Sequence, residues 1–155
     1  MKKIYRKNVA AIILNNDNCL LACHRADKKG VWQLPQGGID EGEEPKETLF
    51  RELQEEIGTA EVEVIAQLEK SIKYDWPPHL YSRGFHGQEQ VYFLLRIKEG
   101  AKINLKLHHQ IEFDKYQWMS ISEFINIIYG FKAEAYKSAL NQFAKLYPHY
   151  INIEA

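Results

Sequence analysis

Cysteine is scarce in this chain, and long apolar segments are missing. The two cysteines, Cys19 and Cys23, lie four positions apart in the apolar run CLLAC, and an extended strand would hold them too far apart for a disulfide. No stretch approaches the ~18 consecutive apolar residues of a membrane span. The N-terminus has neither the apolar core nor the cleavage site of a signal peptide. We therefore expect two buried thiols in a cytoplasmic protein.

An excess of charge is lacking as well. The formal net charge is -1, which argues against a protein that holds nucleic acid by bulk charge but is compatible with a local basic rim. The six histidines show no metal-binding spacing. There is no internal repeat, low-complexity run or linker. With 155 residues, 45% of them hydrophobic, the chain is expected to form one domain over 1–155 with a sizeable core.

The most informative stretch is 37–59, with the sequence GGIDEGEEPKETLFRELQEEIGT. It predicts an amphipathic helix that begins near Pro45 and ends at Gly58, because proline is favoured in the first turn and glycine at the C-terminal cap. Acidic residues lie in or just before the first turn, where they suit the helix dipole. At helical spacing, the apolar face that would pack on the core comprises Leu49, Phe50, Leu53 and Ile57.

A second face of this helix carries three carboxylates. Glu52, Glu55 and Glu56 stand at i, i+3 and i+4, where like charges cost about 0.2–0.5 kcal/mol per pair, and they lie toward the negative end of the helix dipole. Local stability does not explain this arrangement. A divalent cation would explain it, since the ion neutralises the cluster and takes its oxygens as ligands. Hard ions such as Mg²⁺ or Mn²⁺ suit an all-oxygen site.

The residues before this helix predict a loop that a ligand could approach closely. Segment 31–35 is typical of a short apolar strand, and Gln36, Gly37 and Gly38 follow it. Loop and helix together match the Nudix box, so the region resembles that family. The matching residues are Gly37, Glu43, Arg51, Glu52, Leu53, Glu55, Glu56 and Gly58, and Thr59 departs by being polar where an apolar residue is usual.

Periodicity and turn residues predict the remaining elements. A hairpin is expected from 9–14 and 19–23, with further strands at 62–68, 72–74, 90–97, 101–107 and 116–119. Ser120 and Glu123 have capping-box spacing and predict a helix to about residue 128, and a last helix ends before Pro148. Segment 79–88 lacks periodicity and is a long loop of the kind that often orders over a ligand. The order of elements favours a mixed sheet between helices.

The resemblance to the Nudix family extends over most of the chain. One branch of the family is similar at Tyr5-Arg6, Asn8-Val9, WQLPQGGID (32–40), YDWPP (74–78), 90–95, and Glu112-Phe113-Asp114 with Trp118. That branch contains bacterial RNA pyrophosphohydrolases and asymmetrically cleaving dinucleoside tetraphosphate hydrolases. The resemblance implies the α/β class, as an α/β/α sandwich with a mixed β-sheet between helices. It also implies hydrolysis of a nucleoside diphosphate linked to another group, with several Mg²⁺ ions.

The resemblance also implies which residues hold the metal and catalyse the reaction. Glu52, Glu55 and Glu56 would be metal ligands, with Glu52 as the general base, and the Gly37 carbonyl and Glu112 would complete the site. Taken alone, Glu112 would be interpreted as a solvated residue, since an exposed loop glutamate usually has no other role. Its position in the EFD run favours the functional role.

Other residues are implied to bind the substrate. Arg6 and Arg25 would contact its phosphates, which suits the bidentate guanidinium group, although the basic loop 24–29 could equally be a solvated loop. That loop also appears one residue longer than in some relatives. Phe131 and Lys132 correspond to a Phe-Lys pair of the bacterial RNA enzymes, in which the aromatic ring stacks on the first base. A core role for Phe131 is the alternative.

These residues support a hydrolase of phosphoric anhydride bonds, in which metals bridge the phosphate oxygens and a carboxylate takes a proton from the attacking water. The favoured interpretation is a Mg-dependent RNA 5′ pyrophosphohydrolase that converts 5′-triphosphorylated RNA to 5′-monophosphorylated RNA and so promotes mRNA decay. The alternative is an asymmetrical dinucleoside tetraphosphate hydrolase that forms ATP and AMP. A non-catalytic nucleotide-sensing module is a minor alternative, because the box carboxylates are all present. A monomer is expected, and the preferred substrate, the number of ions and any protein activator are left open.

Overall fold

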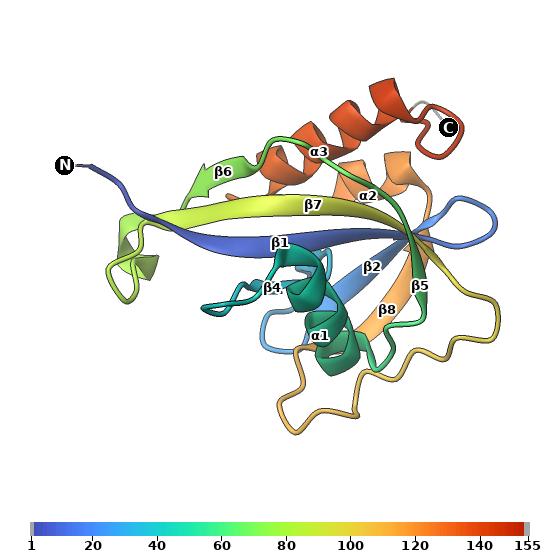
Figure 1. The fold of residues 1–155 in the computed structure, drawn as a ribbon, viewed down its shortest axis with the longest axis horizontal. Helices are drawn as coiled ribbons and strands as arrows, with labels where there is room; N and C mark the ends of the chain where they lie inside the picture. Colours follow the sequence, from blue (N-terminus) through green and yellow to red (C-terminus); the bar gives the residue numbers. More distant parts are fainter. Residues whose placement is uncertain (1, 154–155) are drawn as a thin grey trace.

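The computed structural model describes residues 2–153, which form a mixed β-sheet flanked by helices (Figure 1). The strands are β1 (Tyr5–Leu14), β2 (Leu20–Arg25), β3 (Trp32–Gln33), β4 (Gln36–Gly38), β5 (Val62–Gln67), β6 (Ile72–Asp75), β7 (Gly87–Ile97) and β8 (Phe113–Met119). The helices are α1 (Pro45–Ile57), α2 (Ile121–Ile127) and α3 (Ala133–Leu146), with a short 3₁₀ turn η1 (Pro78–Leu80).

The sheet is built around two long parallel strands. β1 and β7 pair in parallel from Tyr5 opposite Gly87 to Leu14 opposite Arg96. The other strands are antiparallel to their neighbours: β2 and β4 pair with β1, β5 and β6 pair with β7, and β3 and β8 pair with β2. The expected mixed sheet is therefore confirmed.

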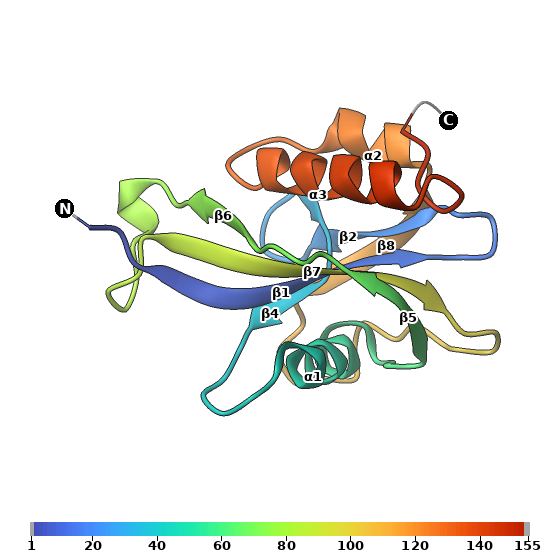
Figure 2. The same ribbon diagram turned by 45° about the horizontal axis from the view of Figure 1, so that its top comes forward.

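Helices cover both faces of this sheet. Figure 2 shows α1 on one side and α2 with α3 on the other. Alternate residues of β1 consequently enter two separate cores: Ala10 and Ile12 pack under α2 and α3, whereas Ala11 and Ile13 pack under α1. A strand buried on both faces has a continuous apolar sequence, which explains the run VAAIIL. The α/β/α sandwich is confirmed.

Helix α1 has the ends that its sequence predicts. Pro45 is its first residue, and the backbone N–H of Glu44 donates to the Glu47 carboxylate at 3.1 Å. Gly58 ends it with a φ of 76°, in the left-handed region that favours glycine. A Cβ at this position would also overlap the backbone oxygen of Asn104. The helix is thus fixed at both ends, which fixes the direction of its acidic face.

Two predictions of strands and one of a loop are corrected by the structure. Segment 31–35 contains only the short strand β3, because Leu34 and Pro35 end it and proline has no N–H to donate to a ladder. The predicted loop of Gln36, Gly37 and Gly38 is instead the strand β4, which pairs with β1. Segment 101–107 contains no strand. Its alternating Ile103 and Leu105 pack on the core under α1 as part of a loop, and Asn104 N–H donates to the carbonyl of Ile57 at the end of α1.

Most of the other elements agree with the sequence. The hairpin of β1 and β2, the strands β5, β6, β7 and β8, and α3 are present, although β7 begins at Gly87, three residues before the expected start. Ser120 Oγ accepts from Glu123 N–H at 3.1 Å, so the predicted cap of α2 is confirmed. Cys23 is buried, but Cys19 is only partly buried, so the expectation of two buried thiols holds for one of them. Among the described residues, no helix is both long and apolar enough to cross a membrane.

Candidate active site

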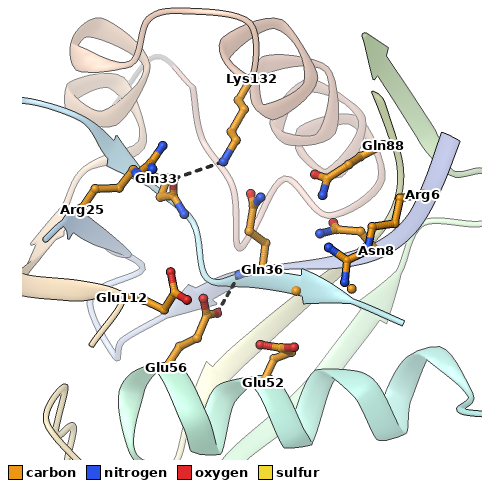
Figure 3. Close-up of a pocket in the computed structure, with 12 residues that line it drawn as sticks. Arg6, Asn8, Arg25, Gln33, Gln36, Glu52, Glu56, Gln88, Glu112 and Lys132 are labelled. Carbon is orange, nitrogen blue, oxygen red and sulfur yellow. Dashed lines mark hydrogen bonds between the residues drawn. The ribbon is translucent and has the colours of Figure 1, made fainter. Parts of the chain in front are cut away.

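A cleft of about 300 Å³ opens where α1, β4 and the first halves of β1 and β7 meet (Figure 3). Its lining is mostly polar and combines carboxylates, cations and amides from across the sequence. The lining residues are Arg6, Asn8, Arg25, Gln33, Gln36, Gly37, Gly38, Glu52, Glu56, Gln88, Glu112 and Lys132. Of the residues singled out from the sequence, Arg6, Arg25, Gly37, Glu52, Glu56, Glu112 and Lys132 meet here, and Glu55 and Phe131 do not line this cleft.

Glu56 is the most deeply placed carboxylate of the cleft. Its residue is only 6% exposed, and its Oε1 accepts a hydrogen bond from Gln36 N–H at 2.9 Å. Burial raises the pKa of Glu56 well above its usual value, and the neighbouring Glu52 and Glu112 raise it further. Such a group is costly to keep ionised without a cation.

Glu52 lies one turn earlier in α1, directly beneath β4 and its Gly37. A Cβ at Gly37 would overlap the end of the Glu52 side chain, so glycine at this position of β4 leaves room for that carboxylate. Burial raises the pKa of Glu52, while Arg51, whose Nη1 donates to its Oε1 at 2.9 Å, opposes that rise. Glu52 is thus a partly desolvated carboxylate with one fixed oxygen.

Arg51 organises the acidic residues around it. Its guanidinium donates to both oxygens of Glu43 at 2.8 and 2.9 Å and to the carbonyl of Gly38 at 3.0 Å, in addition to Glu52. Glu55 lies 3.6 Å from the same group. Arg51 therefore links the end of β4 to α1 and forms an ion pair with Glu55, which does not line the cleft.

The ion pair of Arg51 with Glu43 gives a testable pH dependence of stability. The hydrogen bond from Arg51 lowers the pKa of Glu43 from 4.5 to about 2. A carboxyl whose pKa is lower in the folded state stabilises the fold above its unfolded pKa and loses that contribution as pH falls toward the folded pKa. We expect Glu43→Gln to be less stable than the native protein near pH 6 and to converge with it between pH 4.5 and about 2. Thermal unfolding across this pH range measures the difference in stability, with the exposed Glu63→Gln as control. A difference in stability between the native protein and Glu43→Gln that does not change with pH would contradict the role of the ion pair.

Cations face the carboxylates from the opposite wall. In Figure 3, Arg25 and Arg6 lie on opposite sides of the cleft, and Lys132 points down between them. Lys132 Nζ donates to Gln33 Oε1 at 3.2 Å, and burial, followed by the charge of Arg25, lowers its pKa to about 8. Arg25 is held by Asp27 through two hydrogen bonds of 2.8 and 2.7 Å. The cleft thus has an acidic floor and a basic rim.

Amide side chains complete the cleft, and the sequence analysis missed them. Asn8, Gln33, Gln36 and Gln88 line the cleft, and Asn8 Oδ1 accepts at 2.8 Å from Nε2 of Gln90, a buried residue on the adjacent strand behind the cleft. Gln36 Oε1 accepts from the hydroxyl of Tyr136 at 2.7 Å. No local signal marks these amides, because Asn8 follows Lys7 and Gln90 follows Glu89 in the sequence. Their burial depends on the pairing of β1 with β7, and a buried polar side chain needs a partner.

A smaller apolar pocket of about 110 Å³ adjoins the cleft. It contains Trp32 and Phe131 and shares Arg25, Gln33 and Lys132 with the cleft. Phe131 is 36% exposed, with its ring centroid 6.0 Å from that of Tyr74. The alternative in which Phe131 is a core residue is therefore wrong. We call this space the aromatic pocket.

Comparison with known proteins accounts for this combination of loop, helix and cleft. The model of the NUDIX domain matches residues 4–141. The chain belongs to the Nudix family. Similar Nudix proteins include the RNA pyrophosphohydrolase of Campylobacter jejuni (strain 81-176), 44% identical over 148 residues, covering 92% of this chain and 94% of that protein. The RNA pyrophosphohydrolase of Helicobacter pylori (strain G27) is 43% identical over 151 residues, covering 94% and 97%.

Solved structures agree on the Nudix fold. The dihydroneopterin triphosphate pyrophosphohydrolase of E. coli has a TM-score of 0.68 at 20% identity and covers 86% of this chain and 94% of its own. A binary complex of the Ap4A hydrolase of C. elegans has a TM-score of 0.64 at 17% identity and covers 89% of this chain and 99% of its own. At these identities the likeness concerns the fold.

Nudix hydrolases generally use divalent metal ions, and the donors of this cleft fit such an ion. Glu52, Glu56 and Glu112 all point into the cleft in Figure 3, and the charges of Glu52 and Glu112 both raise the pKa of Glu56. As the side chains stand, no three His, Cys, Asp or Glu residues within 2–153 are placed to hold one metal ion. One oxygen of Glu52 is bonded to Arg51 and one oxygen of Glu56 to the N–H of Gln36, so each carboxylate would have its other oxygen to offer an ion.

Proposed function

We propose that this Nudix protein is a Mg-dependent RNA 5′ pyrophosphohydrolase, which converts 5′-triphosphorylated RNA to 5′-monophosphorylated RNA and so promotes mRNA decay. The observation that carries the proposal is the cleft itself, with an acidic floor opposite a basic rim and the aromatic pocket at one end. The names of relatives that match over nearly their whole length support it. We further propose that the protein acts in the cytoplasm, as one domain over 1–155 and as a monomer.

The acidic residues would bind the metal and activate water. Glu52, Glu55 and Glu56, with the Gly37 carbonyl and Glu112, supply only oxygen donors, which suit more than one Mg²⁺ or Mn²⁺ ion. Such ions would neutralise the phosphate oxygens and lower the pKa of water. Glu52 is the proposed general base, because it is partly desolvated and one of its oxygens is fixed by Arg51.

The basic and aromatic residues would bind the substrate. Arg6 and Arg25 are proposed to bind its phosphates from the two sides of the cleft. Lys132, between them, would add a third positive charge. Phe131 is proposed to stack on the first base, since its ring is exposed in the aromatic pocket next to the cleft. Stacking on an aromatic ring tolerates different bases, so little dependence on the first base is expected.

A second candidate activity is the asymmetrical hydrolysis of diadenosine tetraphosphate to ATP and AMP. It is favoured by the YDWPP run at 74–78, and by a polar cavity beyond Arg6 that is described below. A non-catalytic sensing module is disfavoured, because the carboxylates of α1 are retained and two of them, Glu52 and Glu56, point into the cleft.

A comparison of kcat/KM tests the proposal. The substrates are a short 5′-triphosphorylated RNA and diadenosine tetraphosphate, each with Mg²⁺ and with products identified. We expect a preference for RNA, with release of pyrophosphate or of successive phosphates. A preference for the dinucleotide would replace the proposal by the second candidate, and no turnover of either would favour the sensing module.

Removal of the Arg25 side chain should weaken substrate use more than metal binding. Loss of a charge-assisted hydrogen bond to phosphate is expected to lower kcat/KM of Arg25→Ala about tenfold. Mg²⁺ binding, measured by calorimetry, should stay within about twofold of the native value, because Arg25 contributes no metal ligand. Lys29→Ala, an exposed change in the same loop, is the control. If Arg25→Ala lost metal binding, the loop would instead be structural.

A further inference from the structure

A third cavity lies beyond Arg6, on the side of the cleft away from the aromatic pocket. It measures about 370 Å³ and is lined by Arg6, Trp76, Ser82, Arg83 and Phe85. We call it the far pocket. Arg6 lines both the far pocket and the cleft, just as Arg25 and Lys132 line both the cleft and the aromatic pocket. The three spaces therefore form a series, with the phosphate-sized polar cleft in the middle and aromatic side chains at both ends.

The wall of the far pocket is held in place by hydrogen bonds. Ser82 and Phe85 exchange backbone hydrogen bonds of 3.2 and 2.8 Å around a two-residue turn. Arg83 occupies this turn with a φ of 52°, a left-handed conformation that is uncommon for a residue with a side chain. A glycine or asparagine would suit the turn better, so the arginine there has a cost that the turn itself does not explain.

The same segment is tied to the N-terminal strand. His86 N–H donates to the carbonyl of Ile4 at 2.7 Å, and the His86 Nδ1 accepts from Ile4 N–H at 3.0 Å. Trp76 N–H donates to the carbonyl of His86 at 2.8 Å. Trp76 and Phe85 are both partly buried and line the far pocket. A ligand would meet a largely preformed pocket.

We propose that the far pocket binds a second nucleobase of the substrate, stacked on Trp76 or Phe85, with Arg6 and Arg83 on the adjoining phosphate. The chemistry is that of single-strand nucleotide recognition, in which aromatic rings take the bases and arginines take the backbone. This inference rests on the proposed function. The order of the three spaces fits the distal nucleoside of a dinucleoside polyphosphate, whose phosphate chain carries a base at each end. A downstream nucleotide of RNA is joined to the first nucleoside, at the aromatic-pocket end, and reaches the far pocket only if the RNA folds back.

Binding measurements with ligands of one and two bases test the proposal. The ligands are ATP, diadenosine tetraphosphate and a short 5′-triphosphorylated RNA, and the variants are Arg83→Gln and Phe85→Ala. Dissociation constants are measured by calorimetry with Mg²⁺ in a Glu56→Gln background, which is expected to leave the ligands intact. Lys145→Gln removes an exposed positive charge on α3 outside the three spaces and is the control.

We expect each variant to weaken the binding of diadenosine tetraphosphate about tenfold and the binding of ATP by less than about twofold. Weakening of the dinucleotide alone identifies the distal nucleoside, and weakening of RNA alone identifies the downstream nucleotide. Unchanged affinity for both, or an equal loss for ATP, would overturn the proposal. Because the readout is binding, failure of the native enzyme to hydrolyse RNA would reject the proposed function and leave this test unaffected.

Discussion

Glu56→Gln is expected to abolish Mg²⁺-dependent hydrolysis while leaving the protein at least as stable as the native form. The amide keeps the shape of the side chain and an oxygen that accepts from Gln36 N–H. It removes a negative charge that is almost fully buried, and burying such a charge is costly. The same charge is one that the proposed ions require, so activity and stability should move in opposite directions.

The expected loss in kcat is on the order of 10²–10⁴, the range associated with a misplaced acid-base or metal-linked carboxylate. Initial rates and thermal unfolding of the same preparation measure the two effects. Glu63→Gln, an exposed change on β5, is the matched control and should alter neither. Turnover of Glu56→Gln at the native rate would remove the acidic face of α1 from the mechanism.

Arg51→Ala is expected to damage both the fold and the activity. The substitution leaves Glu43 and Glu52 facing each other without their shared cation and breaks the bond to the Gly38 carbonyl. Lost hydrogen bonds between charged groups cost roughly 1.5–3 kcal/mol. Because Arg51 is partly exposed, we expect the free energy of unfolding to fall by about 2 kcal/mol. For a domain of this size this lowers Tm by about 4–8 °C.

Activity should fall by about 10²-fold, further than the loss of stability explains, because Arg51 no longer positions Gly38 of β4 and the Glu52 carboxylate. Arg51→Lys separates the two effects, since it keeps the charge but not the planar fork. A double-mutant cycle with Glu43→Ala measures the coupling between the two side chains. Independent, additive effects of the two changes would show that Arg51 does not act through Glu43.

The sequence was most informative where local rules act alone. The caps at Pro45 and Gly58 and the spacing of Glu52 and Glu56 follow from helix geometry, and the structure reproduces them. The prediction of a strand at 101–107 was wrong, because alternating apolar residues also suit a loop that packs against the core. Only the tertiary structure decides between the two.

Long-range contacts limited the prediction of the cleft. Arg51 belongs to the Nudix box, but its hydrogen bonds to Glu43 and to the Gly38 carbonyl depend on how residues 39–44 connect β4 to α1. The amides of Asn8 and Gln90 come together only when distant strands pair. Likewise, no local pattern indicates that Phe131 is exposed next to Tyr74, 57 positions earlier in the sequence.

The parallel pairing of β1 with β7 has a consequence for how the chain folds during synthesis. Each residue of β1 meets a partner 82 positions later. The first strand to leave the ribosome therefore waits, with one edge unpaired, until almost two thirds of the chain has been made. Native contacts of such long sequence separation form slowly, and exposed strand edges in the meantime favour association with other chains. We expect refolding to be limited by this one pairing and its yield to fall as protein concentration rises.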